Sequence, residues 1–202
     1  MRRERTVTGA IALIAVVSIG IFLFTLQHAL FVFQESGTPM QASVALASTV
    51  ATSSLPMRLI IPSLSINASV QHVGVNLLGN MKAPNNFTDV AWYEYGTVPG
   101  DQGSAVIAGH VDNGLALDGV FKHLANLQIG NDVYIQTVDG TKLHFVVSDI
   151  EIYPYQDVPT DVLFGQKDAA RLNLITCEGT WVGGRDTYDH RLVIYTQLVK
   201  NG

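Results

Sequence analysis

Seven short segments between residues 57 and 199 are rich in Val, Ile, Leu, Tyr and Thr, and turn-forming Gly, Asn, Asp or Pro residues separate them. Such segments are typical of β-strands, and Asp139-Gly140 between two of them is a tight-hairpin signal. Only residues 118–124 and 161–164 indicate helical turns, each opening with an Asp suited to N-capping. Many short strands usually close into a barrel or pack as a sandwich, so the sequence predicts a mainly β, mostly antiparallel domain. The predicted strands are 57–62, 65–71, 104–109, 132–137, 143–152, 171–177 and 191–199.

A long charge-free stretch precedes this β-rich part. Residues 6–34 contain no Asp, Glu, Lys or Arg, and their length is sufficient to cross a bilayer as a helix. Three arginines precede the stretch and no basic residue follows until Arg58, which predicts a cytoplasmic N-terminus with the rest of the chain outside. A cleaved signal peptide is the alternative, with small residues at 45–47, but its apolar region is usually only about 7 to 15 residues long.

The sequence therefore predicts a single-pass protein of the cell membrane with an extracytoplasmic β domain. The segment after the span is rich in Ser, Thr, Ala and Gln and lacks aromatic residues, which indicates a flexible tether. Acidic residues outnumber basic ones, 17 to 12, so nothing indicates a nucleic-acid-binding surface. The predicted parts are a basic cytoplasmic end (1–8), a transmembrane signal anchor (9–33), the tether (34–56) and the β domain (57–202).

The chain has one cysteine, Cys177, in the part predicted to lie outside the membrane. One cysteine cannot form a disulfide within the chain, and an unpaired thiol in an exported protein is open to oxidation. Catalysis or pairing with another molecule would explain its presence. The alternative is a buried cysteine that serves only as a small apolar side chain.

Three polar residues lie at the ends of predicted strands. His110 follows the apolar run 104–109, Cys177 ends a second run, and Arg191 begins the last one. The ends of neighbouring strands in a barrel can converge on one rim. Taken singly, a histidine or arginine at a strand end is more often an ordinary surface residue. Together they fit acyl transfer, because a catalytic thiol needs a nearby imidazole or positive charge and the oxyanion needs donors.

Several stretches resemble the motifs of the sortase family. The sequence SAVIAGHVD at 104–112 resembles the sortase histidine motif, LITC at 174–177 resembles its Thr-Cys motif, and HRLVIY at 190–195 resembles the strand that bears its arginine. RLIIP at 58–62 is similar to the opening strand of the family, and the resemblance extends in order over nearly all of 57–199. The apolar pattern around the histidine is closer to the minor classes D, E and F than to the housekeeping type.

The resemblance implies a closed eight-stranded β-barrel with short helices and a membrane-anchored cysteine transpeptidase. By analogy, Cys177 attacks a carbonyl in a C-terminal LPxTG-like sorting signal of an exported surface protein and forms a thioester. His110 protonates the leaving amine and deprotonates the incoming one, Arg191 holds the substrate and the oxyanion, and Thr176 supplies a supporting hydrogen bond. The acceptor amine would belong to a peptidoglycan precursor or a pilin.

Three neighbouring residues qualify this assignment. Glu178 follows the nucleophile, and its carboxylate would oppose thiol ionisation unless strand alternation turns it to the other face. Arg185 is a second candidate for the essential arginine, although Arg191 is favoured by its place at the strand start. Asp112 can orient His110 or simply form a turn.

A metal site and two other families of cysteine enzymes fit the sequence less well than a sortase does. The remaining histidines show no helix-face spacing typical of a metal site, so no metal or other cofactor is expected. L,D-transpeptidases surround the nucleophile with a Ser-His-Gly-Cys-type sequence that is absent here, and papain-like enzymes place Cys before His. A catalytically silent, anchored barrel that binds a peptide or scaffolds a surface assembly stays open, since a fold alone does not establish activity. The histidines in question are His72, His123, His144 and His190.

Overall fold

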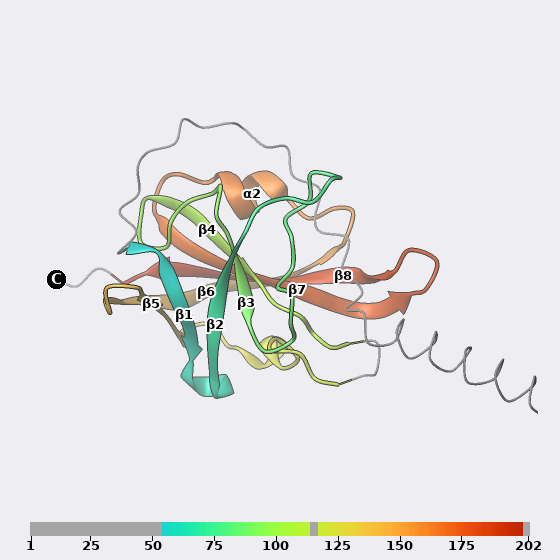
Figure 1. The fold of residues 1–202 in the computed structure, drawn as a ribbon, viewed down its shortest axis with the longest axis horizontal. Helices are drawn as coiled ribbons and strands as arrows, with labels where there is room; N and C mark the ends of the chain where they lie inside the picture. Colours follow the sequence, from blue (N-terminus) through green and yellow to red (C-terminus); the bar gives the residue numbers. More distant parts are fainter. Residues whose placement is uncertain (1–53, 114–116, 200–202) are drawn as a thin grey trace, which may run out of the picture. The chain divides into compact units, whose positions relative to one another are not determined.

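Eight strands form in the computed structural model, which describes residues 54–113 and 117–199 (Figure 1). Short helical turns connect some of them: the 3-10 helices η2 (Pro62–Leu64) and η3 (Leu124–Asn126) and the α-helix α2 (Thr160–Gly165). The strands are β1 (Pro56–Ile61), β2 (Ile66–Val73), β3 (Val90–Tyr93), β4 (Gly103–Ala108), β5 (Asp132–Thr137), β6 (Lys142–Pro154), β7 (Ala170–Val182) and β8 (Thr187–Leu198).

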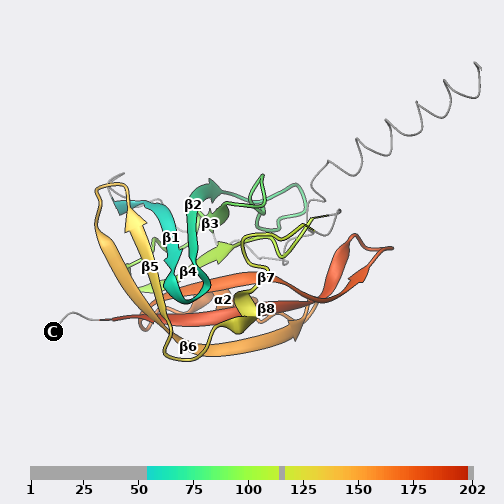
Figure 2. The same ribbon diagram turned by 90° about the horizontal axis from the view of Figure 1, so that it is seen from below.

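The strands close into a barrel in the order β1-β2-β3-β4-β7-β8-β6-β5, with β5 pairing back onto β1. Figure 2 shows the barrel from a second side, with the long β7–β8 hairpin extending past the other strands. Most neighbours are antiparallel, whereas β2 with β3 and β4 with β7 are parallel. The closed, mainly β barrel expected from the sequence is confirmed, and closure leaves no long unpaired edge.

Alternate side chains of each strand fill the barrel interior. Leu172 and Leu174 of β7 point inward with Leu192 and Ile194 of β8, and all four are at most 1% exposed. Each such side chain contributes about 1.5–3 kcal/mol on burial. This interior cluster is the main core, and it fixes which residues of the same strands must point outward.

The outward side chains of β3, β4, β7 and β8 form a second apolar cluster. Val106, Ile175 and Val193 are buried there, and Leu163 of α2 packs over them. The Nδ2 of Asn173 donates to the Leu163 carbonyl at 2.7 Å and holds α2 against the sheet. The outer face of these strands is therefore covered by α2 and neighbouring segments.

The predicted Asp139-Gly140 hairpin is confirmed between β5 and β6. Gly140 has a φ of 86°, which favours glycine, and its N–H donates to the Thr137 carbonyl at 2.9 Å. The Asp139 carboxylate accepts hydrogen bonds from the Thr137 hydroxyl and the Thr141 N–H.

Four details of the predicted elements were wrong. Strand β7 runs on to Val182 and β8 starts at Thr187, so Cys177 and Arg191 lie within strands and not at their ends. Strand β3 was missed because its four residues are all buried and show no alternation. Residues 118–124 form turns instead of a helix, because Asp118 forms an isolated bridge with Asp112, and the helical turn η3 begins only at the end of that range. Residues 161–164 lie in α2 as expected, but its N-cap is Pro159 and no side chain caps it, so Asp161 occupies the first turn instead.

Residues 1–53 lie outside the described residues, and with them the predicted cytoplasmic end, membrane span and nearly all of the tether. Nowhere in residues 54–113 and 117–199 is a helix long and apolar enough to cross a membrane. The predicted tether boundary at residue 56 falls on the first residue of β1.

Candidate active site

Cys177 and Arg191 lie directly opposite each other on the antiparallel strands β7 and β8. Ile175 lies two residues before Cys177, and Val193 lies two residues after Arg191. Both belong to the outer apolar cluster, so strand alternation directs Cys177 and Arg191 to the outer face as well. Opposite residues of an antiparallel pair have Cβ atoms about 4.5–5.5 Å apart. The strand register alone therefore brings the thiol beside the arginine.

His110 reaches the same face from β4. The parallel register of β4 and β7 pairs Ala108 with Ile175, and the Gly109 N–H continues it by donating to the Ile175 carbonyl at 3.2 Å. The Thr176 hydroxyl donates to the Gly109 carbonyl at 2.8 Å and fastens the two strands at this level. His110 and Cys177 each lie two residues beyond the paired Ala108 and Ile175, so a continuation of this register would bring His110 alongside Cys177.

The imidazole of His110 is oriented by the chain around it. Its Nε2 lies 2.8 Å from the Pro84 carbonyl oxygen, which can only accept, so Nε2 carries a proton and donates. In the neutral ring Nδ1 is then the basic nitrogen. The Phe87 ring packs against the imidazole with centroids 4.9 Å apart. The Phe121 N–H donates to the His110 carbonyl at 2.9 Å and fixes its backbone.

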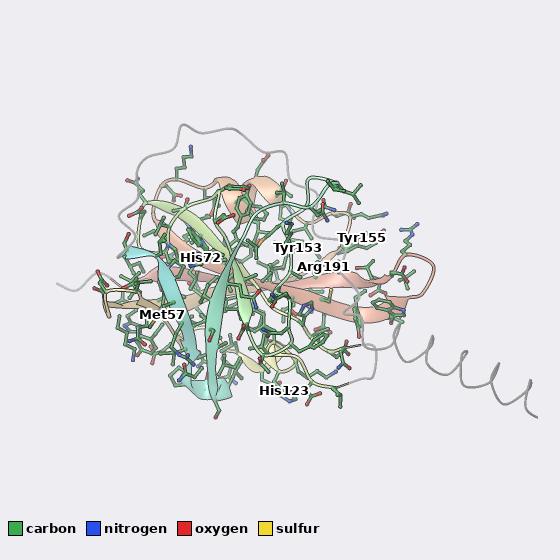
Figure 3. The ribbon with its side chains drawn as sticks, viewed as in Figure 1. Met57, His72, His123, Tyr153, Tyr155 and Arg191 are labelled. Carbon is green, nitrogen blue, oxygen red and sulfur yellow. The ribbon has the colours of Figure 1, made fainter. Side chains whose placement is uncertain are left out.

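The guanidinium of Arg191 folds back onto the segment that precedes it. Its Nη1 donates to the carbonyl oxygens of His190 and Tyr188 at 2.8 and 3.1 Å, and its Nη2 donates to the Thr187 hydroxyl at 2.7 Å. The Tyr155 ring lies 5.7 Å from the guanidinium carbon, and Figure 3 shows Arg191 among the tyrosines at the end of β6. These contacts fix the positive charge beside the thiol.

The three groups are nearly inaccessible in this conformation. Cys177 is 0% exposed, His110 1% and Arg191 4%. The Cys177 thiol is therefore closed off from solvent by neighbouring segments.

The other predicted site residues have different surroundings. Thr176 points to the face opposite Cys177 and bonds the backbone before the histidine. The Asp112 carboxylate accepts a hydrogen bond from the Tyr188 hydroxyl, and the exposed Arg185 donates to the Tyr155 hydroxyl at 2.7 Å. Arg185 is not in register with the thiol, so the geometry favours Arg191.

Glu178 is turned away from the thiol by strand alternation, as anticipated. It pairs with His190 across β7 and β8, and its carboxylate accepts the Gly179 N–H at 3.1 Å. Beyond it, hydrogen bonds from His190 and from the Thr180 N–H hold the pKa of Asp189 below its usual value. Glu178 and Asp189 are thus both engaged in contacts within the hairpin.

An apolar surface lies beneath the site on the same face. Tyr195 of β8 lies there, and burial raises its pKa above the ordinary value, with a smaller contribution from the hydroxyl of Tyr153 at 3.2 Å. Burial likewise raises the pKa of Tyr93 on β3, with a smaller effect of Tyr95. Both phenols therefore stay neutral near pH 7.

The remaining histidines lie apart from one another. His72 bonds the Pro56 carbonyl at 2.9 Å, and His144 bonds Asp132 at 2.7 Å. Figure 3 shows His72 and His123 in separate parts of the domain. Within residues 54–113 and 117–199, no group of three or more His, Cys, Asp or Glu side chains is arranged to hold a metal ion.

Sequence reasoning missed the residues that hold the charged groups. Thr187 and Tyr188 hold Arg191, Tyr155 packs on it, and Pro84 orients the imidazole. Pro84 acts through its backbone and carries no sequence signal. The two β8 residues were placed before the predicted strand, whose true start at Thr187 lies four residues earlier than expected.

Solved structures of sortases share this fold. Sortase C-1 from Actinomyces oris is 23% identical, with 71% of this chain and 73% of that chain covered and a TM-score of 0.55. A sortase D5 transpeptidase from Clostridium perfringens is 21% identical, with 72% of this chain and 79% of that chain covered and a TM-score of 0.53. Sortase A from Corynebacterium diphtheriae is 20% identical, with 73% of this chain and 62% of that chain covered and a TM-score of 0.56.

Comparison with curated protein sequences gives no match. The family model described as the Sortase domain matches residues 59–199, which is most of the chain and includes every residue of the candidate site. The chain therefore belongs to the sortase family.

Proposed function

We propose that the chain is a membrane-anchored cysteine transpeptidase that cleaves a C-terminal LPxTG-like sorting signal and transfers the acyl group to an amine. The observation that supports this proposal is the strand register: it opposes Cys177 to Arg191, and the pairing of β4 with β7 runs to Ala108 and Ile175, two residues before His110 and Cys177. A thiol, an imidazole and a guanidinium on one face are the groups that thioester chemistry requires.

Acylation begins when the peptide opens the site and the Cys177 thiolate attacks the carbonyl carbon before the scissile bond. A C–S bond forms and the carbonyl oxygen becomes an oxyanion beside Arg191. The oxyanion then collapses, the C–N bond breaks, and protonated His110 gives its Nδ1 proton to the leaving amine. The products are a thioester on Cys177 and a free amine on the released fragment.

Transfer reverses these roles. An incoming amine attacks the thioester carbonyl, His110 takes the proton that the amine loses, and the Cys177 thiolate departs. The new bond is an amide, so no net hydrolysis occurs. The guanidinium contributes in both steps because its hydrogen bonds to the hairpin backbone hold it in place before charge develops.

The charge-free residues 6–34 and the arginines before them support a location on the outer side of the cell membrane, anchored by one span. An enzyme held there would meet exported proteins as their C-termini emerge. The acceptor would be an amine on a peptidoglycan precursor or on a pilin. The similar solved structures are sortases of classes A, C and D.

The test uses the full chain in detergent with a panel of LPxTG-like peptides and an amine acceptor, and mass spectrometry identifies the products. We expect amide exchange with at least one peptide, lost in both Cys177→Ala and His110→Ala. Thr196→Val, a buried substitution at the far end of β8, serves as the control that retains activity. A folded chain that exchanges no peptide would support the silent-barrel alternative, whereas a Cys177→Ala chain that still exchanges peptides would refute Cys177 as the nucleophile.

A further inference from the structure

A hydrogen bond links the loop after His110 to the β7–β8 hairpin. The Tyr188 hydroxyl lies 2.7 Å from each carboxylate oxygen of Asp112, so its one O–H is shared between them. Asp112 follows His110 by two residues, and Tyr188 precedes Arg191 by three. The contact therefore joins the two segments that carry the histidine and the arginine without passing through the thiol.

On the hairpin side, the same residues hold the guanidinium. The Tyr188 carbonyl accepts from Arg191 Nη1, and the neighbouring Thr187 hydroxyl accepts from Nη2. The Tyr188 ring also packs edge-on against Trp181 of β7, with centroids 5.4 Å apart. Any shift of residues 187–188 would move the guanidinium with them.

On the histidine side, the loop is equally well connected. The Gly119 N–H donates to the Val111 carbonyl at 2.9 Å, and a Cβ on Gly119 would collide with the His110 carbonyl oxygen. Asp112 also pairs with Lys122 at 3.3 Å. A movement of the Asp112 carboxylate is thus transmitted to the His110 backbone.

The hairpin extends past the rest of the barrel in both views, so its tip needs contacts with the body of the domain to keep a fixed position (Figures 1 and 2). On the β6 side the Tyr155 N–H donates to the Asp189 carbonyl at 2.9 Å. On the His110 side the Asp112–Tyr188 hydrogen bond serves this purpose.

We propose that Asp112 and Tyr188 form a positioning pair that sets the distance between His110 and Arg191 for acyl transfer. This inference rests on the proposed function. It assigns the Asp112 carboxylate to the hairpin, where it accepts the Tyr188 hydroxyl. Neither member of the pair touches the reacting atoms.

The test compares Tyr188→Phe, Asp112→Ala and the double variant of the full chain with the wild type in the amide-exchange assay. Tyr188→Phe removes only the hydroxyl and keeps the ring and the backbone acceptor. We expect each single variant to lower kcat by about tenfold, the effect of losing a hydrogen bond to a charged group, with KM nearly unchanged. The double variant should also lose about tenfold, because both substitutions remove the same contact.

Lys122→Met provides the matched control, since it removes the partly exposed ion pair of Asp112 and leaves the Tyr188 contact in place. It should retain wild-type kcat. Hydrogen–deuterium exchange should rise at residues 110–113 and 185–190 in Tyr188→Phe and stay unchanged in β1 and β2.

Two results would overturn the inference while leaving the proposed function standing. One is a Tyr188→Phe chain with wild-type kcat, and the other is a double variant whose loss is the product of the two single losses. A wild-type chain without amide exchange would refute the proposed function instead.

Discussion

Thr187→Val removes one of the hydrogen bonds that hold the Arg191 guanidinium, the one from Nη2 to the Thr187 hydroxyl. Thr187 is 1% exposed, Arg191 is 4% exposed, and the hydroxyl accepts from Nη2 at 2.7 Å. Valine nearly matches threonine in size, so the substitution leaves no cavity but leaves a buried, charged N–H without its acceptor. Loss of a hydrogen bond to a charged group costs about 1.5–3 kcal/mol. At about 1.4 kcal/mol per factor of ten, kcat/KM should fall by roughly 10- to 100-fold if the arginine acts in the transition state.

The assay measures kcat/KM for amide exchange together with the free energy of unfolding in denaturant. Thr196→Val is the matched control, because Thr196 is also buried on β8 and donates to the Leu172 carbonyl at 2.6 Å, away from the site. It should lose about 1 kcal/mol of stability and no activity. Equal activity losses in the two variants, or none in Thr187→Val, would refute the reasoning.

Three further substitutions test other parts of the account. Gly119→Ala should cost about 1–3 kcal/mol and lower activity, because its Cβ meets the His110 carbonyl; a fully active, equally stable variant would contradict this. Ile107→Ala, at a fully buried core position, should lose about 2–5 kcal/mol in denaturant unfolding, and a smaller loss would mean that the barrel interior is looser than described. The hydrogen bond from Arg171 lowers the pKa of Asp168, so this contact stabilises the fold above about pH 4 and is lost as the pH falls through the lowered pKa. Asp168→Asn should therefore flatten the decline in Tm below about pH 4, and an unchanged decline would exclude this contribution.

The strands were predictable where burial alternates along them. In β5, buried residues at Val133 and Ile135 alternate with half-buried ones, and the predicted bounds match the strand. In β3 all four residues are buried, so no alternation marks it. The parallel pairing of β4 with β7 depends on contacts between distant segments, and no local pattern encodes it.

His110, Cys177 and Arg191 could be proposed from the sequence because they border apolar runs and stand in stretches that resemble sortase motifs. The residues that hold these groups in place could not be predicted from the sequence. Tyr188 acts partly through a backbone carbonyl and partly through a hydroxyl whose acceptor, Asp112, is 76 residues away. Pro84 acts through its carbonyl alone. Such contacts are set by the tertiary register and leave no trace in composition or spacing.

The central claim is that Cys177 carries the acyl group as a thioester. The direct measurement is intact-protein mass spectrometry of the full chain, quenched with acid during turnover of an active peptide without acceptor amine. We expect an adduct with the mass of the N-terminal peptide fragment, located on Cys177 and removed by hydroxylamine. Product formation without such an adduct, at a time resolution that captures the first turnover, or an adduct on another residue, would contradict it.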